Sequence, residues 1–174
     1  MLRPKNNKTK SRIKHRPFLK WAGGKFRLTD DLNRVFPKRK QCLIEPFVGA
    51  GAVFLNSHFE RYILADINPD LINLFNIVKD NVDAYIEACK PIFFAENANT
   101  AEYYYAQRDT FNQSTDPFER SVLFLYLNRF GFNGLCRYNS KNEFNVPFGA
   151  YKTHYFPEDE LRYFAHKAQS AVFL

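Results

Sequence analysis

The sequence holds only three cysteines, Cys42, Cys89 and Cys136, and no two of them form a CxxC pair. Neither a zinc site nor a disulfide framework is therefore indicated, and we expect no bound metal. No run of about 18 apolar residues occurs, so nothing predicts a membrane span. The N-terminal stretch MLRPKNNKTKSRIKHRP lacks the apolar segment of a secretory signal and the regular apolar face of a transit peptide. These absences favour a reducing cytoplasm.

Two nucleotide-binding fingerprints are also missing. No GxxxxGK[ST] occurs, so Lys25 in WAGGK is not a phosphate-loop lysine. The stretch CLIEPFVGAGAVFLN, residues 42–56, carries Gly49 and Gly51. A dinucleotide fingerprint wants a third glycine three residues further on, where this chain has Phe54. An NAD-type oxidoreductase is therefore disfavoured.

Positive charge is concentrated near the N-terminus. The first 40 residues hold 14 of the 25 Lys and Arg and two acids, Asp30 and Asp31, for a net charge of +12. The remainder, with 11 bases and 16 acids, has a net charge of −5. A basic arm beside a near-neutral body indicates an anionic polymer as partner, although a solubilising tail fits the charge equally well. Residues 1–16 are predicted to be a basic flexible leader.

Hydrophobic residues make up 45% of the chain and aromatic residues 17%, which predicts a packed core. In the first half, the pattern predicts an extended piece, a Gly-Gly turn and a helix over 18–36, then a strand over 43–47, a turn over 48–51 and a helix over 52–57. A second buried strand over 62–65 ends before Asp66, and Pro69 begins the next helix. Strands alternating with helices are typical of α/β folds.

The second half has a different character, because residues 81–130 are mostly helical and rich in Tyr and Phe. Asp116 as N-cap, Pro117 at the first position and Glu119 at the third predict a capping box. The helix that follows is apolar nearly all round and should be buried. A β-hairpin is predicted around the turn-rich NSKN, residues 139–142, then a helix over 159–167 and a strand starting in AVFL.

A strand, a Gly-x-Gly turn, a helix and a second strand ending in an acid are typical of the nucleotide end of a doubly wound sheet. Asp66 suits two ribose hydroxyls, because a carboxylate accepts from both. A ligand with a ribose but no pyrophosphate fits, and S-adenosylmethionine meets that description; a mere tight turn is the alternative. Trp21 suits either a core anchor or a ring stacked on an adenine or near a sulfonium, and Lys25 suits a carboxylate.

The stretch NRFGFNGLCRYNSKNEFNVPF, residues 128–148, interleaves aromatics, amides and arginines. Arg137 could read a guanine through a bidentate contact, and Phe132 could wedge between base pairs. An ordinary hairpin with a packed aromatic face fits the composition equally well.

Four motifs, in this order, resemble the Dam family of DNA adenine-N6 methyltransferases: FLKWAGGK, LIEPFVGAGAVFLN, RYILADIN and FLYLNRFGFNGLCRYN with EFNVPFG. The resemblance runs from about Arg16 to the last residue. It implies an α/β fold, an incomplete Rossmann-like methyltransferase sheet with an inserted, mostly helical target-recognition domain bearing a β-hairpin. The implied parts are the first stretch of the S-adenosylmethionine-binding domain over 17–75, the target-recognition domain over 76–156, and a truncated return to the α/β domain over 157–174.

The resemblance also implies roles for individual residues. The cofactor S-adenosylmethionine would be bound by Trp21, Lys25, Gly49, Gly51 and Asp66. Lys20 is implied to reach the first guanine of GATC, and Arg137 the guanine on the other strand. Phe132 and Asn133 match a Tyr-Asn pair that inserts into the duplex during base flipping. Further contacts to the site are implied for Leu135, Pro147 and Tyr151.

The departure from the family is its catalytic Asp-Pro-Pro-Tyr motif, which does not occur in these residues, so no catalytic residue is assigned. The implied reaction is methyl transfer from S-adenosylmethionine to adenine in double-stranded GATC sites, by a protein that is monomeric when complete and associated with the nucleoid. The 174-residue chain alone is expected to be inactive. The alternative is a catalytically silent DNA-binding remnant of such an enzyme.

Overall fold

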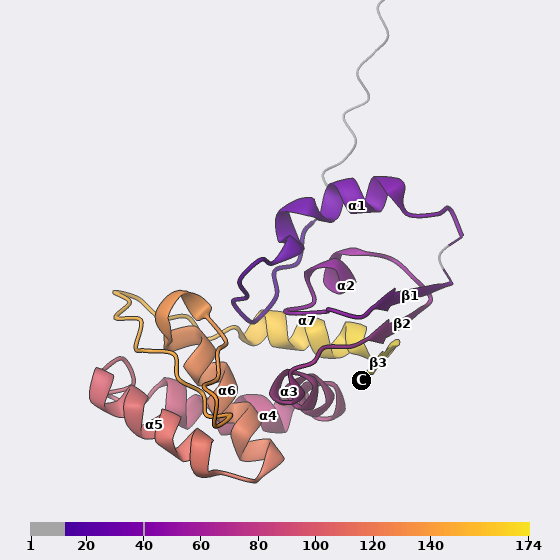
Figure 1. Cartoon of the computed structure of the whole chain (residues 1–174). Coiled ribbons are helices and arrows are strands. Elements are labelled where there is room, and N and C mark those ends of the chain that lie inside the picture. Colours follow the sequence, from indigo (N-terminus) through magenta and orange to yellow (C-terminus); the bar gives the residue numbers. More distant parts are fainter. Residues whose placement is uncertain (1–12, 40) are drawn as a thin grey trace, which may run out of the picture.

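The computed structural model describes residues 13–39 and 41–174 (Figure 1). Most of the predicted leader lies outside this range. The elements follow in the order η1 Lys25–Leu28, α1 Thr29–Val35, β1 Cys42–Glu45, α2 Ala52–Asn56, β2 Arg61–Leu64, α3 Pro69–Asp80, α4 Val82–Phe93, α5 Ala101–Gln113, α6 Pro117–Phe130, η2 Phe132–Gly134, α7 Glu158–Ala168 and β3 Ala171–Phe173. The predicted α/β character is confirmed. None of the helices described is both long and apolar enough to cross a membrane.

The three strands form one parallel sheet in the order β1-β2-β3. Helices pack against one face of this sheet. Alternate residues of a strand point to the same side, so each strand contributes a set of side chains to this face. On that side Phe173 of β3 meets Phe54 of α2, Phe75 of α3 and Phe164 of α7, with ring centroids 5.3–6.2 Å apart. This aromatic cluster fixes the three helices against the sheet.

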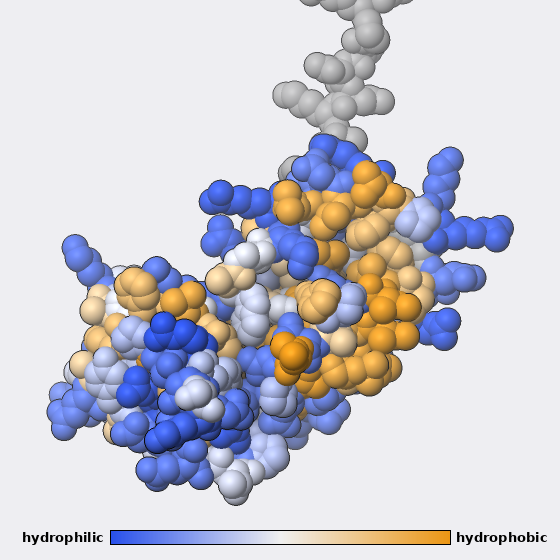
Figure 2. Space-filling view, in the orientation of Figure 1, coloured by the Kyte–Doolittle hydropathy of each residue, from blue (hydrophilic) through white to orange (hydrophobic). Residues whose placement is uncertain are grey.

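The opposite face of the sheet is apolar but open to solvent. Ile44 pairs in register with Ile63, and Ile63 pairs with Val172, so the three side chains form one row across the strands. Ile44 is 66% exposed and Val172 is 53% exposed. Figure 2 shows apolar side chains gathered over this side of the molecule. Within residues 13–39 and 41–174, helices therefore cover one face of the sheet only.

Helix α6 is the centre of the helical half of the protein. Nine of its residues are buried, which confirms the prediction from its apolar sides, and it packs against α3, α4 and α5. Its N-cap is Asp116, whose Oδ1 accepts from Phe118 N at 2.8 Å. The second half of the predicted capping box is absent, because Glu119 accepts from the Ser114 hydroxyl, and this hydroxyl in turn accepts from Asp116 N.

The predicted hairpin lies within residues 131–150, which we call the hairpin segment. In place of two strands it has two isolated antiparallel bridges, Gly131 with Phe148 and Tyr138 with Phe144. The reason lies in the hairpin segment itself, where Glu143 N donates to the side chain of Asn139 at 3.0 Å and Asn145 O accepts from the side chain of Arg137 at 3.2 Å. Side chains thus take two of the backbone groups that a longer ladder would use.

Helix α3 connects the two halves. Asn68 caps it and Pro69 is its first residue, while Leu71, Leu74, Phe75 and Val78 form its buried face. The helix packs against α6 of the helical half and α7 of the sheet half. It runs without a break through residues 75 and 76, where the sequence places a domain boundary.

Candidate functional site

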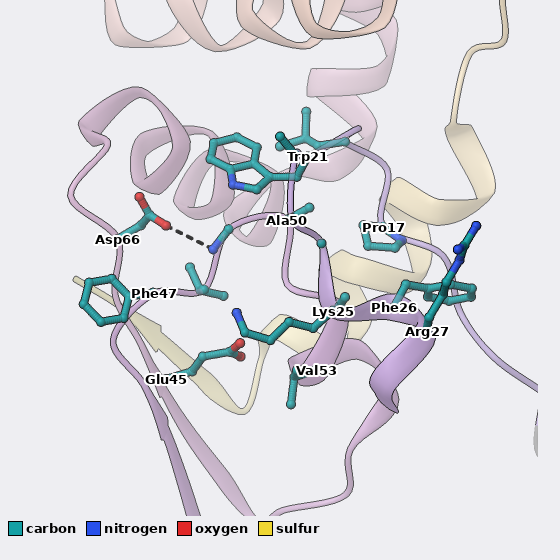
Figure 3. Close-up of a pocket in the computed structure, with 17 residues that line it drawn as sticks. Pro17, Trp21, Lys25, Phe26, Arg27, Glu45, Phe47, Ala50, Val53 and Asp66 are labelled. Carbon is teal, nitrogen blue, oxygen red and sulfur yellow. Dashed lines mark hydrogen bonds between the residues drawn. The ribbon is translucent and has the colours of Figure 1, made fainter. Parts of the chain in front are cut away.

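A cavity of about 570 Å³ opens at the carboxyl ends of β1 and β2 (Figure 3). Open α/β sheets bind ligands at this edge. Four of the five residues predicted to bind a cofactor line the cavity, namely Trp21, Lys25, Gly49 and Asp66. The fifth, Gly51, is not among the lining residues; it is the N-cap of α2, with a left-handed φ of 76°.

Asp66 follows β2, and its carboxylate is held by two backbone amides. Oδ2 accepts from Gly49 N at 3.0 Å, and Oδ1 accepts from Asn68 N at 3.1 Å. A carboxylate oxygen has a second lone pair, so each can still accept a hydrogen bond from a ligand hydroxyl. The carboxylate therefore faces the cavity (Figure 3) in one fixed orientation.

Glu45, the last residue of β1, also lines the cavity but was not among the predicted site residues. Its Oε2 is buried and has no hydrogen-bond partner. Burial raises the pKa of Glu45 to about 7, against the smaller opposing effects of nearby Lys25 and a backbone hydrogen bond from Phe54. Figure 3 shows the Lys25 side chain extending toward this carboxylate. An acid at the end of the apolar stretch LIEPF is the sequence signal that could have identified it.

Lys20 lies one residue before Trp21 but points to the helical half. Its Nζ donates to Arg129 O at 2.9 Å and lies 3.8 Å from the ring centroid of Tyr151. Burial, together with the neighbouring charge of Arg129, lowers the pKa of Lys20 to about 8. The structure thus brings together two of the residues predicted to contact DNA, Lys20 and Tyr151.

The start of the hairpin segment presents several of the other predicted residues. Phe132 is 48% exposed, and Asn133 is exposed in a left-handed conformation with φ 53°. Pro147 is also exposed. It lies next to Phe132, because its carbonyl accepts from Phe132 N at 2.8 Å. Leu135 is half-buried. The apolar ring of Phe132 and the side-chain amide of Asn133 therefore lie at the surface, and the hydrogen bond to Pro147 O holds the backbone that carries them.

Arg137 is exposed further along the hairpin segment. Its guanidinium is oriented by Asn145, because Nε donates to Asn145 Oδ1 at 2.7 Å and Nη2 donates to Asn145 O at 3.2 Å. A side chain held in this way loses less conformational freedom when it binds a ligand.

No group of three or more His, Cys, Asp or Glu side chains in the described part of the chain is arranged to hold a metal ion. The charged side chains of the cavity are a carboxyl group from each of two strand ends, Lys25 and Arg27. They suit a ligand with hydroxyls and with charges of both signs.

Comparison with known proteins agrees with this architecture. Residues 21–174 match the family described as D12 class N6 adenine-specific DNA methyltransferase. The chain is 83% identical over all its 174 residues to a DNA adenine methylase of Haemophilus influenzae, of which it covers 61%. It is 64% identical over 160 residues to the DNA adenine methylase of Escherichia coli K12, and 60% identical over 161 residues to that of Vibrio cholerae.

The alignments with the last two relatives cover 92% of this chain and 57% of each relative. The chain therefore spans about three fifths of the length of the curated relatives it matches. A match over most of its residues and identities of 60% or more lead to one conclusion: the chain belongs to the family of D12 class N6 adenine-specific DNA methyltransferases.

Proposed function

We propose that the complete protein transfers a methyl group from S-adenosylmethionine to the N6 amine of adenine in GATC sites of duplex DNA. Residues 1–174 would supply the donor pocket and the surface that reads the DNA. The observation that carries the proposal is that Asp66, Trp21, Lys25 and the Glu45 carboxyl, whose Oε2 has no partner, meet in one cavity.

The cavity fits the methyl donor in size and in the chemistry of its lining. Its volume of about 570 Å³ lies in the range of small-molecule sites. Asp66 would accept from the ribose hydroxyls, and Lys25 would pair with the donor's carboxylate. The buried Oε2 of Glu45, which has no protein partner, would accept from the donor's ammonium group. The indole of Trp21, which lines the cavity, would face the adenine or the positive sulfonium.

When bound, the donor supplies a methyl group activated by the sulfonium charge. The N6 lone pair of adenine is delocalised into the ring, so the amine is a poor nucleophile that must be positioned accurately. The residues of this chain bind and orient the two partners. No Asp-Pro-Pro-Tyr occurs among them to accept the amine hydrogens, and we expect no methyl transfer from the 174-residue chain alone. Incorporation of tritiated methyl into a GATC duplex measures this directly.

On the DNA side, we propose the division implied by the sequence, with residues 76–156 as the recognition part. Arg137 would contact a guanine edge, and Lys20 another. Phe132 and Asn133 would enter the stack when the adenine leaves it, because the target amine cannot be reached inside a duplex. Further contacts to the DNA site would come from Leu135, Pro147 and Tyr151. The exposure of Phe132 and the fixed guanidinium of Arg137 support these roles.

The donor pocket can be tested on the chain itself, since Trp21 is its only tryptophan and lines the cavity. Titration with S-adenosylmethionine should change the indole fluorescence. Asp66→Ala should weaken binding by about 1–3 kcal/mol, because the ribose hydroxyls lose their acceptor. Asp109→Ala, which removes an exposed acid from α5, is the matched control and should leave the affinity unchanged. Equal affinities for all three proteins would remove Asp66 from the site.

A further inference from the structure

The cavity and the hairpin segment are joined by the short stretch of residues 66–70. Asp66 at its start lines the cavity, and Asp70 at its end lies in the first turn of α3. Two side chains of this stretch, Asn68 and Asp70, make hydrogen bonds to the hairpin segment. They approach the residues on either side of Arg137.

Asn68 makes the first of these bonds. Its Oδ1 caps α3 by accepting from Asp70 N at 3.0 Å and Leu71 N at 3.3 Å. The remaining polar group, Nδ2, donates to the sulfur of Cys136 at 3.2 Å. Because Asn68 N also donates to Asp66 Oδ1, one residue links the cavity carboxylate, the helix start and the hairpin segment.

Asp70 makes the second bond. Its Oδ2 accepts from the hydroxyl of Tyr138 at 2.6 Å, and both of its oxygens accept from Arg120 of α6 at 2.9 Å. The guanidinium of Arg120 also donates to the carbonyls of Phe111 and Ser114. Asp70 is therefore tied to the helical half on one side and to the hairpin segment on the other.

Cys136 and Tyr138 flank Arg137, and successive residues of an extended backbone point to opposite sides. The two flanking side chains are half-buried against residues 66–70, while Arg137 between them is exposed. The backbone that carries the exposed guanidinium is thus held by two hydrogen bonds to the stretch that carries the cavity carboxylate.

We propose that Asn68 and Asp70 are positioning residues that couple occupation of the cavity to the placement of Arg137 on DNA. This inference rests on the proposed function. A ligand that bonds to Asp66 stabilises residues 66–70 in the arrangement described, and through the bonds to Cys136 and Tyr138 it stabilises the backbone of Arg137 as well. DNA then binds to a protein whose Arg137 backbone fluctuates less and loses less conformational entropy on binding, so each ligand tightens the binding of the other.

The test uses the 174-residue chain, a labelled GATC duplex and S-adenosylhomocysteine, with fluorescence anisotropy as the readout. In the parent chain, a saturating concentration of S-adenosylhomocysteine should tighten DNA binding about 5- to 150-fold, the usual range of coupling between two sites. Tyr138→Phe keeps the ring against Phe144 and removes the hydroxyl bound to Asp70. Cys136→Ala removes the acceptor of Asn68. Both changes should reduce the tightening toward one-fold.

Tyr126→Phe is the matched control. It removes a buried hydroxyl that donates to Ala98 O at 2.7 Å, in the helical half and away from residues 66–70. A merely structural effect of losing a tyrosine hydroxyl would appear in this control as well, whereas the proposal requires it to keep the parent's coupling.

Loss of coupling in the two variants but not in the control would support the inference. Retained coupling in both variants, or independent binding of the two ligands by the parent chain, would overturn it and leave the proposed function standing. A parent chain that binds neither S-adenosylhomocysteine nor the duplex would refute the proposed function, and this inference with it.

Discussion

The indole of Trp21 lies against the α-carbon of Gly49, so that a Cβ added to Gly49 would meet Trp21 Cδ1 and Nε1 at 3.0 Å each. The two residues come from separate loops of the cavity wall. Trp21, the only tryptophan in the chain, can therefore occupy this position only because residue 49 has no side chain.

Gly49→Ala should displace the indole, because its Cβ is tighter against the ring than ordinary contacts allow. The change should shift the Trp21 emission and weaken binding of S-adenosylmethionine. Gly51→Ala is the control: Gly51 also has a positive φ, but its Cβ would meet other atoms only at 3.6 Å or more. Both variants should lose about 1–2 kcal/mol of stability from left-handed strain. An emission shift of the same size in both would contradict the role given to Gly49.

Glu45→Gln should stabilise the protein at alkaline pH. The pKa of Glu45 is raised from 4.5 to about 7, so the folded state holds this proton more tightly than the unfolded state does. Stability from this group is complete below about pH 4.5 and is lost as pH rises through 7. The variant should therefore match the parent near pH 4.5 and exceed it at pH 8, by on the order of 3 kcal/mol.

Urea unfolding at several pH values measures this difference. Glu60→Gln, at an exposed acid, should show no such change with pH. If Glu45 also accepts from the donor's ammonium, Glu45→Gln should weaken S-adenosylmethionine binding at pH 8 while it raises stability. If the free energy of unfolding of Glu45→Gln equalled that of the parent at every pH, the carboxyl of Glu45 would not be held in its neutral form.

Lys20 should make DNA binding sensitive to pH above about 8. Its pKa in the free protein is about 8, so the side chain loses its charge in this range. An acceptor on DNA favours the charged form, and binding must then take up a proton. Affinity for a GATC duplex should fall by up to about tenfold per pH unit between pH 8 and 9.5.

Lys20→Arg should remove this dependence, because arginine stays protonated throughout the range. Lys141→Met is the control, since it removes an exposed charge from the hairpin segment and should leave the pH profile unchanged. Anisotropy titrations across pH give both answers. An identical slope for the parent and Lys20→Arg would exclude Lys20 from the DNA contact.

Arg137→Ala should reduce discrimination between GATC and a one-base variant by about 1–3 kcal/mol. A phosphate contact would instead weaken all sequences equally and lower the salt dependence of binding. Measurements on both duplexes at several salt concentrations separate the two. Asn145→Ala, which removes the acceptor that orients the guanidinium, should give a smaller loss in the same direction.

The elements with strong local signals were predictable from the sequence. Helix α6 followed from Asp116, Pro117 and an apolar surface on all sides, and the glycine turn after β1 followed from Gly49 and Gly51. These features depend on residues close together in the chain. The hairpin strands were wrong because the side chains of Asn139 and Arg137 bond to Glu143 N and Asn145 O, which a longer ladder would use.

The candidate site was predictable to a similar extent. The sequence indicated four of the residues that line the cavity, Trp21, Lys25, Gly49 and Asp66. It did not indicate the buried carboxyl of Glu45, whose isolation depends on tertiary packing. Nor did it indicate the bonds from Asn68 to Cys136 and from Tyr138 to Asp70, since each joins residues 68 positions apart in the chain. Hydrogen bonds of this range leave no periodic signal in a single sequence.

The order of strands in the sheet also has a consequence for how the chain folds. Strands β2 and β3 pair in parallel although about 110 residues separate them, and parallel pairing at such a distance is intrinsically slow. Helices α4, α5 and α6 lie between the two strands in the sequence, and α6 contacts both α4 and α5 over shorter chain separations. We expect amides in α6 to gain protection from hydrogen exchange before those of β3. During synthesis, Tyr62 and Leu64 would thus spend many seconds with only part of their final cover.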